Sequence, residues 1–319
     1  MPLLEVENLR IEFPTRRGTL VAVDDVSFGI DEGEVLGVVG ESGAGKSLTG
    51  AAVIGLLEPP GRIAYGVIRL GGRRIDNLPY EEMRRIRGKE IGTIFQDPLT
   101  SLNPLYTIGR QLVETITTHM DLTAAQARKH AIDLIGQVGI PTPARCMDCY
   151  PHEFSGGMRQ RIVIALALCA NPRLIIADEP TTALDVSIQA QIIALLKRLC
   201  REYGAAVMLI THDMGVIAET ADRVAVMYVG RIAEIGPIRD VVKNAKHPYT
   251  VGLMGAIPLI GRDTERLTQI DGSMPRLTDI PQGCGFNPRC EHVMPRCENE
   301  RPELIATDGA SLASCWLYE

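Results

Sequence analysis

The sequence predicts an α/β fold in which a mostly parallel sheet carries helices on both faces, followed by a smaller cysteine-rich segment. Three observations predict this fold. Strand-like and helix-like patterns alternate from the N-terminus to about residue 247. A glycine-rich loop, GESGAGKS, stands between a short apolar run and a helical pattern. Beyond that point the composition shifts to proline, turn formers and four of the eight cysteines.

The spacing of apolar residues locates each element. Residues 4–13 alternate apolar and polar side chains, as an amphipathic strand does. Residues 107–149 are polar with helical spacing, and we expect a helical insertion there. Pro59 and Pro60 should end the helix that follows the glycine-rich loop. The expected elements are strands at 4–13, 20–30 and 34–40, a helix at 47–57, the helical insertion, a helix at 157–170, a strand at 173–178, a helix at 187–203, a strand at 205–210 and a hairpin at 224–236.

Composition narrows the classes of function. The chain has 319 residues and a net charge of −6, without a long basic run, which argues against bulk electrostatic binding of nucleic acid. The start has early acidic residues and no apolar leader, and no stretch reaches the roughly 18–20 apolar residues of a membrane span. We therefore expect a cytosolic protein with reduced thiols, in which the eight cysteines do not form four disulfides.

GESGAGKS fits the pattern of a phosphate-binding loop, and a strand and a helix flank it as that pattern requires. Its glycines let successive backbone N–H groups point at phosphate oxygens, and the helix adds its positive N-terminal end. Lys46 would contact the β- and γ-phosphates, and Ser47 would offer its hydroxyl to Mg²⁺. A chance glycine loop is the alternative, which the flanking elements disfavour. The predicted nucleotide-binding residues of the loop are Gly40, Glu41, Ser42, Gly43, Ala44, Gly45, Lys46 and Ser47.

The stretch RLIIADEP predicts a buried strand that ends in two carboxylates, Asp178 and Glu179. Asp178 would hold Mg²⁺ through water, and Glu179 would orient or deprotonate the attacking water. Apolar runs that end in two acidic residues are common. The presence of a phosphate loop in the same chain is what gives this one its functional interpretation.

The stretch FSGGMRQR begins a helix with small residues, Ser155, Gly156 and Gly157. The N-terminus of a helix is a site for anions. Taken alone, the stretch is more simply interpreted as an N-cap, with a serine followed by glycines.

Together these three stretches resemble the nucleotide-binding subunits of ABC transporters, over residues 1–250. GESGAGKS is similar to Walker A, LIIADE to Walker B and FSGGM to the signature motif, although Met158 stands where most members carry glutamine. The resemblance implies a P-loop ABC ATPase cassette, with a RecA-like core, an antiparallel β subdomain and a helical subdomain at about 97–157. It also implies further site residues: Gln96 of the Q-loop at Mg²⁺ and the attacking water, His212 as the switch histidine, Asp185 in the D-loop facing a partner, and Phe13 against adenine.

Several stretches narrow the resemblance to the peptide/nickel import branch: FQDPLTSLNP, YPHEFSGGMRQR, HPYT and GCGFNPRC. Within that branch the chain is similar to the subunit type with a C-terminal cysteine cluster, here residues 251–319. The resemblance implies ATP and Mg²⁺, a second, related ATPase subunit, two transmembrane permease subunits and, indirectly, an extracytoplasmic solute-binding protein. It implies a peripheral position at the cytoplasmic face of the membrane and no nucleic acid partner. The solute, whether dipeptide, oligopeptide, nickel or another small molecule, is not encoded in this subunit.

The four C-terminal cysteines have the spacing C-x5-C-x6-C-x17-C. This spacing lacks the paired C-x2-C knuckles of most zinc sites and the C-x2-C-x2-C run of small ferredoxins. On residue chemistry alone a 4Fe–4S cluster and a Zn²⁺ ion are equally suitable, and four unlinked thiols are the third possibility. The resemblance to peptide importer subunits favours iron–sulfur. The proposed ligands are Cys284, Cys290, Cys297 and Cys315; His292 is an alternative ligand, but is more simply interpreted as a solvent-facing bystander.

Other classes of function fit the sequence less well. A non-transport ABC ATPase that acts on ribosomes or DNA usually has two cassettes or a coiled-coil insertion, and this chain has one cassette and no heptad run. A P-loop GTPase would need an N-K-x-D base reader, which is absent. Exporter ATPases are usually fused to membrane helices. A non-catalytic regulatory subunit is disfavoured by the intact Lys46, Glu179 and His212.

Overall fold

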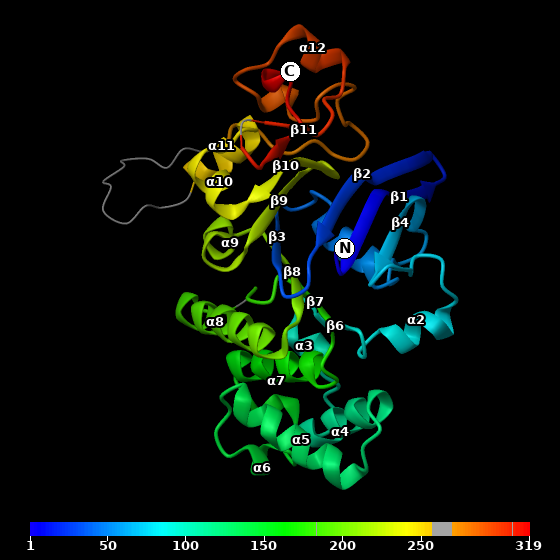
Figure 1. Cartoon of the computed structure of the whole chain (residues 1–319), viewed down its shortest axis with the longest axis vertical. Coiled ribbons are helices and arrows are strands. Elements are labelled where there is room, and N and C mark those ends of the chain that lie inside the picture. The colour runs from blue at the N-terminus through cyan, green and yellow to red at the C-terminus, as the bar shows by residue number, and fades with distance from the viewer. Residues whose placement is uncertain (183, 257–269, 308) are drawn as a thin grey trace. The chain divides into compact units, whose positions relative to one another are not determined.

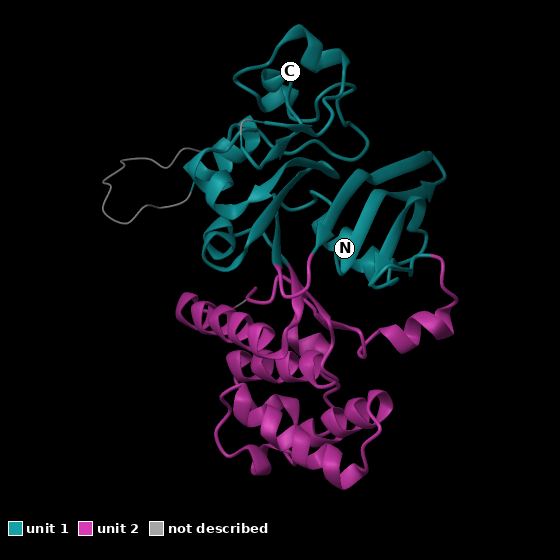
Figure 2. Cartoon of the chain, viewed as in Figure 1, with its two compact units in different colours: residues 1–30, 35–76, 209–319 teal, residues 31–34, 77–208 magenta. Residues whose placement is uncertain are grey.

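The structure is a computed structural model that describes residues 1–182, 184–256, 270–307 and 309–319. The chain forms two compact units, which Figure 2 shows in different colours. The expected phosphate loop and the C-terminal cysteines belong to unit 1, and the expected Walker B carboxylates belong to unit 2. Unit 1 comprises residues 1–30, 35–76 and 209–319, and unit 2 comprises residues 31–34 and 77–208.

Unit 1 contains a four-stranded antiparallel sheet in the order β2-β1-β4-β5 (Figure 1). Both strands expected near the N-terminus are confirmed, but the alternation of buried residues shifts by one position in β1. Val6 and Leu9 are both buried because Asn8, with φ of 47°, lies in a bulge between them. Strand β4 was not predicted from the sequence pattern. The strands are β1 (Leu4–Thr15), β2 (Gly18–Ile30), β4 (Arg62–Leu70) and β5 (Arg73–Arg74).

The other strands of unit 1 are hydrogen-bonded in the order β11-β12-β10-β9-β3. The pair β3 and β9 is parallel, as expected, and β9 and β10 form the expected antiparallel hairpin. The last strands of the chain join this sheet, since Glu234 of β10 pairs with Ala313 of β12. The C-terminal segment therefore packs on the same sheet that carries the phosphate loop. The strands are β3 (Val35–Val39), β9 (Arg223–Tyr228), β10 (Arg231–Pro237), β11 (Ile305–Ala306) and β12 (Leu312–Ala313).

The helix after the glycine-rich loop is shorter than expected. It ends at Val53 rather than at residue 57, because Gly55, with φ of 63°, takes the left-handed conformation just past the helix end. The prolines at 59 and 60 are not what ends it. The helical elements of unit 1 are α1 (Lys46–Val53), α9 (Met214–Thr220), α10 (Ile238–Lys243), α11 (Pro248–Gly255), α12 (Pro295–Asn299), and the 3₁₀ turns η2 (Asn287–Arg289) and η3 (Trp316–Tyr318).

Unit 2 contains the parallel strand pair β6 and β7, and the expected insertion forms its helices α4, α5 and α6. The helices α4 and α5 lie side by side, and both pack near α7 (Figure 1). Thr123 is the N-cap residue of α5. Its hydroxyl accepts a hydrogen bond from the backbone N–H of Gln126, and the Gln126 side chain accepts one from the backbone N–H of Thr123, which is a capping box. The elements are α2 (Tyr80–Ile86), β6 (Ile91–Ile94), α3 (Pro98–Ser101), α4 (Ile108–His119), α5 (Ala124–Gln137), α6 (Pro143–Cys146), η1 (Pro151–Glu153), α7 (Gly156–Leu168), β7 (Leu174–Asp178), α8 (Val186–Tyr203) and β8 (Ala206–Thr211), whose last residues belong to unit 1.

Candidate functional site

The phosphate loop runs from the end of β3 to the start of α1, as the sequence predicts. Gly45 has φ of 97°, which favours glycine, and a side chain at Gly40 would meet the carbonyl oxygen of Met227 at 2.2 Å. Lys46 is only 5% exposed, and its Nζ donates to the carbonyl oxygens of Gly40 at 2.7 Å and Glu41 at 3.0 Å. The loop is therefore closed by its own lysine, and its outer residues, Ser42, Gly43 and Ser47, are exposed.

The two carboxylates at the end of β7 take different positions. Asp178 is the last residue of the strand, and Glu179 follows it with φ of 45°, an uncommon conformation for a side chain other than glycine. Oε2 of Glu179 accepts hydrogen bonds from Nε2 of Gln96 at 3.1 Å and from Oγ1 of Thr182 at 2.8 Å. The backbone strain is localised at the residue that the sequence analysis assigned to the attacking water.

Gln96 reaches Glu179 because of the register of two parallel strands. Ile94 at the end of β6 pairs with Ala177 near the end of β7, so the residues just beyond both strands emerge at the same edge. The structure thus brings together two residues of unit 2 that lie 83 positions apart in the chain. Thr182, which also contacts the carboxylate, was missed because a lone threonine in a turn carries no motif.

The signature residues begin α7. The Ser155 hydroxyl accepts a hydrogen bond from the Met158 N–H at 3.4 Å, so the N-cap interpretation is correct. Ser155 and Gly156 are exposed. A side chain at Gly157 would meet Cγ2 of Ile188 at 2.8 Å, so this glycine allows α7 and α8 to approach closely. Both roles of the stretch, the cap and an exposed helix N-terminus, are present.

The remaining predicted residues lie at the ends of strands and helices. His212 follows β8 and is exposed, and Asp185 is the exposed N-cap residue of α8. Phe13, near the end of β1, lies against Gly61. The phosphate loop, Phe13 and His212 belong to unit 1, whereas Gln96, Asp178, Glu179, Asp185 and the signature residues belong to unit 2.

The four C-terminal cysteines line one pocket in unit 1, together with His247, Phe286 and His292 among other residues. None of them is in a disulfide. Burial, with the neighbouring cysteines, raises the pKa of Cys284 to about 11, and burial also raises the pKa of Cys290 and Cys315. Within the described residues, no group of three or more His, Cys, Asp or Glu side chains is placed to hold a single metal ion.

The other cysteines are spread over unit 2. Cys169 and Cys200 are each 1% exposed, and burial raises the pKa of both thiols to about 12. Both are therefore core residues of unit 2. Cys146 is buried and Cys149 is half-buried.

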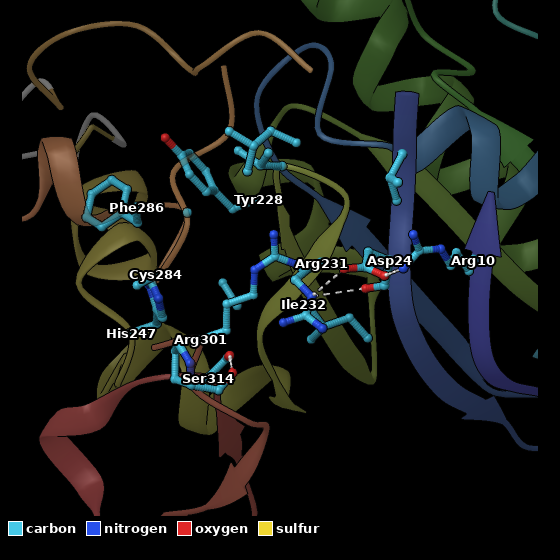
Figure 3. A pocket seen from close by; sticks show the side chains of 17 residues that line it. Arg10, Asp24, Tyr228, Arg231, Ile232, His247, Cys284, Phe286, Arg301 and Ser314 are labelled. Atoms are coloured by element: carbon cyan, nitrogen blue, oxygen red, sulfur yellow. Dashed lines mark hydrogen bonds and ion pairs between the residues drawn. The ribbon is translucent and has the colours of Figure 1, made fainter. Parts of the chain in front are cut away.

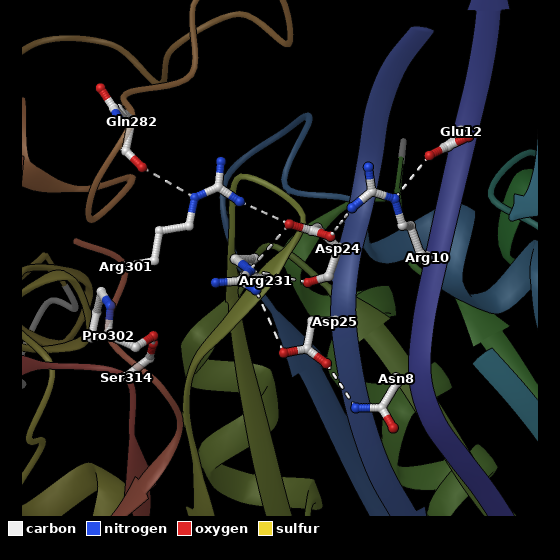
Figure 4. A network of polar contacts seen from close by, with 10 residues as sticks. All are labelled: Asn8, Arg10, Glu12, Asp24, Asp25, Arg231, Gln282, Arg301, Pro302 and Ser314. Carbon is white, nitrogen blue, oxygen red and sulfur yellow. Dashed lines mark hydrogen bonds and ion pairs between the residues drawn. The ribbon is translucent and has the colours of Figure 1, made fainter. Parts of the chain in front are cut away.

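A second pocket of about 150 Å³ lies between the C-terminal segment and the strands of unit 1. Cys284 and Phe286 lie on one side of it, and Asp24 with Arg10 on the other (Figure 3). Asp24 is the centre of a polar network that the sequence did not predict (Figure 4). Its carboxylate accepts from Arg10 at 2.9 Å and from Arg301 at 2.9 Å, and Arg231 lies 3.6 Å away. The network attaches the C-terminal segment to β1, β2 and β10.

No helix among the described residues is both long and apolar enough to cross a bilayer. The phosphate loop, the carboxylate with its glutamine and the exposed signature helix define an ATP-binding cassette. Comparison with known proteins gives the same class. The family model described as ABC transporter matches residues 23–182, and the model described as Oligopeptide/dipeptide transporter, C-terminal region matches residues 233–297. The chain belongs to the ABC transporter family and is an ATPase of that family.

Among similar proteins is the oligopeptide transport ATP-binding protein OppD of Salmonella typhimurium, 47% identical over 98% of this chain and 93% of that protein. The dipeptide transport ATP-binding protein DppD of Bacillus subtilis is 46% identical over 99% of this chain and 95% of the relative. Among solved structures, a dimeric ATP-binding cassette bound to ADP and phosphate has a TM-score of 0.66 at 28% identity, and covers 74% of this chain and 99% of that one. These likenesses confirm the P-loop cassette fold.

Proposed function

We propose that the chain is the ATP-hydrolysing subunit of an importer of di- and oligopeptides, in which ATP binding and hydrolysis drive uptake through partner permease subunits. The observation that carries the proposal is the extent of the likeness. Relatives named for oligopeptide and dipeptide transport match nearly the whole chain, the cysteine-containing C-terminal region included. Nickel or another small solute is the alternative cargo, because the motifs of this subunit do not define the solute.

The phosphate loop, residues 40–47, would bind the nucleotide phosphates. Lys46 would exchange its hydrogen bonds to two loop carbonyl oxygens, at 2.7 and 3.0 Å, for hydrogen bonds to phosphate oxygens, which are stronger acceptors for a cation. Mg²⁺, when bound, would neutralise charge on the phosphates, and the residues proposed to hold it are Ser47, Gln96 and Asp178. Phe13 is proposed to lie against adenine.

Glu179 is the proposed general base. Its carboxylate is held by Gln96 and Thr182, so a water that donates to the carboxylate would be oriented by a fixed acceptor. Gln96 could serve both the carboxylate and Mg²⁺. His212 is proposed to contact the γ-phosphate from the end of β8. These roles together orient water and stabilise charge at the phosphorus that is attacked.

A second ATPase subunit is proposed to complete the site. Ser155, Gly156 and Asp185 are all exposed, as residues that contact a partner must be. In this arrangement the signature helix of one subunit covers the nucleotide on the phosphate loop of the other. Two transmembrane permease subunits, and a solute-binding protein that acts through them, would complete a transporter at the cytoplasmic face of the membrane.

We also propose that residues 1–250 form the nucleotide-binding domain, with a helical subdomain at about 97–157, and that residues 251–319 form a cysteine-rich module. Residues 257–269 of this module lie outside the described residues. A 4Fe–4S cluster is proposed on the four cysteines that line one pocket. Such a cluster takes one thiolate on each iron, so its ligands need not converge on one ion as the ligands of zinc must. Because four thiolates suit both a cluster and Zn²⁺, the family resemblance is the reason to propose the cluster.

The test is reconstitution. The chain would be assembled in proteoliposomes with candidate permease and second ATPase subunits of a peptide importer, and ATP hydrolysis would be measured with and without peptide-loaded binding protein. We expect hydrolysis that rises several-fold with peptide and not with nickel. Stimulation by nickel alone would show that nickel, rather than peptide, is the transported solute. Hydrolysis that does not require the permease would contradict an importer.

A further inference from the structure

Arg289 connects the cysteine segment to the phosphate loop. It directly precedes Cys290, and its side chain is only 6% exposed. Nη1 of Arg289 donates to both carboxylate oxygens of Glu41, at 3.0 and 3.1 Å. The two residues lie 248 positions apart, and both belong to unit 1. A buried arginine of the C-terminal segment thus pairs with the second residue of the loop that is proposed to bind the phosphates.

The guanidinium of Arg289 is fixed by further contacts. Its Nε donates to the carbonyl oxygen of Asp271 at 2.8 Å, and its Nη1 lies 3.3 Å from the hydroxyl oxygen of Tyr228. Burial alone would lower the pKa of Arg289, but hydrogen bonds with Tyr228 and Glu41 outweigh it, so the pKa is raised. The arginine is therefore a permanent charge held in one position.

Two more residues of the C-terminal half contact the loop. The hydroxyl of Tyr249, a fully buried residue, accepts a hydrogen bond from the backbone N–H of Glu41 at 2.9 Å. A side chain at Gly43 would meet the terminal methyl of Met274 at 2.9 Å, so Met274 lies beside the loop. The rings of Tyr228 and Tyr249 both pack against Phe286, which lines the cysteine pocket. The loop and the cysteine segment share one packed cluster.

The negative charge of Glu41 is the reason why its pairing with Arg289 should affect nucleotide binding. A carboxylate in a loop that binds a polyanion repels it, and the repulsion is reduced when a cation pairs with the carboxylate. The Glu41 side chain is 30% exposed, so its pairing with the buried arginine is screened only in part. The sequence motif tolerates any residue at this position, and the pattern alone gives no reason for a negative charge.

We propose that Arg289 is a positioning residue for nucleotide binding, which neutralises Glu41 and holds it against the C-terminal segment. The phosphate loop then receives ATP without an uncompensated negative charge beside it. The inference rests on the proposed role of the loop as the ATP site, and it makes ATP affinity depend on a residue of the cysteine segment. It also assigns to the C-terminal region a function within the ATPase itself.

The test compares charge changes of opposite sign in the full-length chain. ATP binding would be measured by isothermal titration with a non-hydrolysable analogue at physiological salt. Arg289→Ala should weaken binding roughly tenfold, a typical size for energetic coupling between groups. Glu41→Gln should tighten binding by about threefold, because it leaves the cation and removes the anion. The double variant should return to within about threefold of wild type.

Two further variants keep the result interpretable. Arg289→Lys retains the charge and should stay within about threefold of wild type, even if Arg289→Ala folds poorly. Arg296→Ala is the matched control, because Arg296 pairs with Glu300 and Glu319 inside the C-terminal segment; it should bind ATP as wild type does.

Weaker binding in both Arg289→Ala and Glu41→Gln, with no recovery in the double variant, would overturn the inference and leave the contact as a structural support. Lys46→Ala tests the underlying site separately. Unchanged ATP binding in Lys46→Ala would reject the loop as the ATP site, and the inference with it. Opposite signs for the two charge variants, with loss of binding in Lys46→Ala, would support both.

Discussion

The phosphate loop and the cysteine pocket lie in the same unit but are organised differently. Within the loop, Lys46 bonds the carbonyl oxygens of Gly40 and Glu41, and the backbone N–H of Glu41 donates to the hydroxyl of the distant Tyr249. The cysteines come from residues 284–315 and are connected by few backbone contacts, such as the hydrogen bond from the Cys284 N–H to the Cys297 carbonyl oxygen at 2.8 Å. The loop therefore owes part of its shape to a lysine of its own motif, whereas the cysteine pocket is lined by residues from several parts of unit 1.

The two sites also differ in the charge of the ligand they suit. The loop offers N–H groups and a lysine to an anion. Burial raises the pKa of Cys284 to about 11 and also raises the pKa of Cys290 and Cys315, so a bound cation or cluster would be needed to hold these three as thiolates at neutral pH. The Arg289–Glu41 pair is one of several contacts between the phosphate loop and the C-terminal half of unit 1, beside those of Tyr249 and Met274.

The variant Glu179→Gln should give the largest change, and it should lower ATP hydrolysis without lowering ATP affinity. Glu179→Gln removes the proposed base but keeps the shape of the side chain, so ATP hydrolysis by the assembled transporter should fall by ~10²-fold or more while ATP binding persists. The measurement is turnover together with ATP affinity. The matched control is Glu202→Gln, an exposed residue of α8 that pairs with Arg198. Near-normal turnover in Glu179→Gln would reject the assignment.

A smaller effect tests whether the phosphate loop needs glycine at position 45, where it passes close to the backbone of Ala22. Gly45→Ala places a side chain at φ of 97° and within 3.1 Å of the Ala22 carbonyl oxygen. Gly204→Ala has φ of 65° and open space around it, so it reports the cost of the conformation alone. We expect Gly45→Ala to lower the free energy of unfolding by about 1–3 kcal/mol, and Gly204→Ala by about 1 kcal/mol. Equal losses in denaturant unfolding would show that steric contact is unimportant at Gly45.

The smallest effect concerns the wall of the cysteine pocket. Burial lowers the pKa of His247 to about 4. The unfolded chain takes up this proton near pH 6.5 and the folded chain only near pH 4, so the stability from the neutral form is complete above about pH 6.5 and is lost as pH falls through that window. We expect about 1 kcal/mol less stability at about pH 5.5 than at about pH 7.5.

His247→Asn isolates this contribution, because asparagine can still accept the hydrogen bond that the Tyr249 N–H donates to Nδ1 of His247 and does not titrate. The pH dependence of the variant should be flatter by that amount. Parallel stability curves for wild type and variant would show that His247 titrates alike in both states of the chain.

The sequence predicted what depends on local residue types. The glycines and lysine of the loop, the N-cap at Ser155 and the helical insertion follow from patterns that act over a few residues. The family resemblance placed Gln96 at Mg²⁺ and the attacking water, and its hydrogen bond with Glu179 was not predicted. The register that brings them together depends on β6, a strand of four residues that no periodicity revealed.

Other features could not be predicted, because they depend on contacts between distant parts of the chain. Arg289 and Glu41 are ordinary surface-type residues in the sequence, and only the packing of Tyr228, Tyr249 and Phe286 brings them together. The early end of α1 at Val53 is different, since Gly55 could have been recognised as a helix terminator. The prolines that follow gave a stronger signal and were preferred wrongly.

The most direct test of the contrast between the two sites is to purify the chain without oxygen and determine iron, sulfide and zinc per chain with the visible spectrum. Cys297→Ser removes one proposed ligand, and Cys149→Ser, in unit 2, is the matched control. The account predicts about four irons and four sulfides with thiolate–iron absorbance, lost in Cys297→Ser and kept in Cys149→Ser. One zinc and no colour, or no metal in protein that still binds ATP, would contradict it.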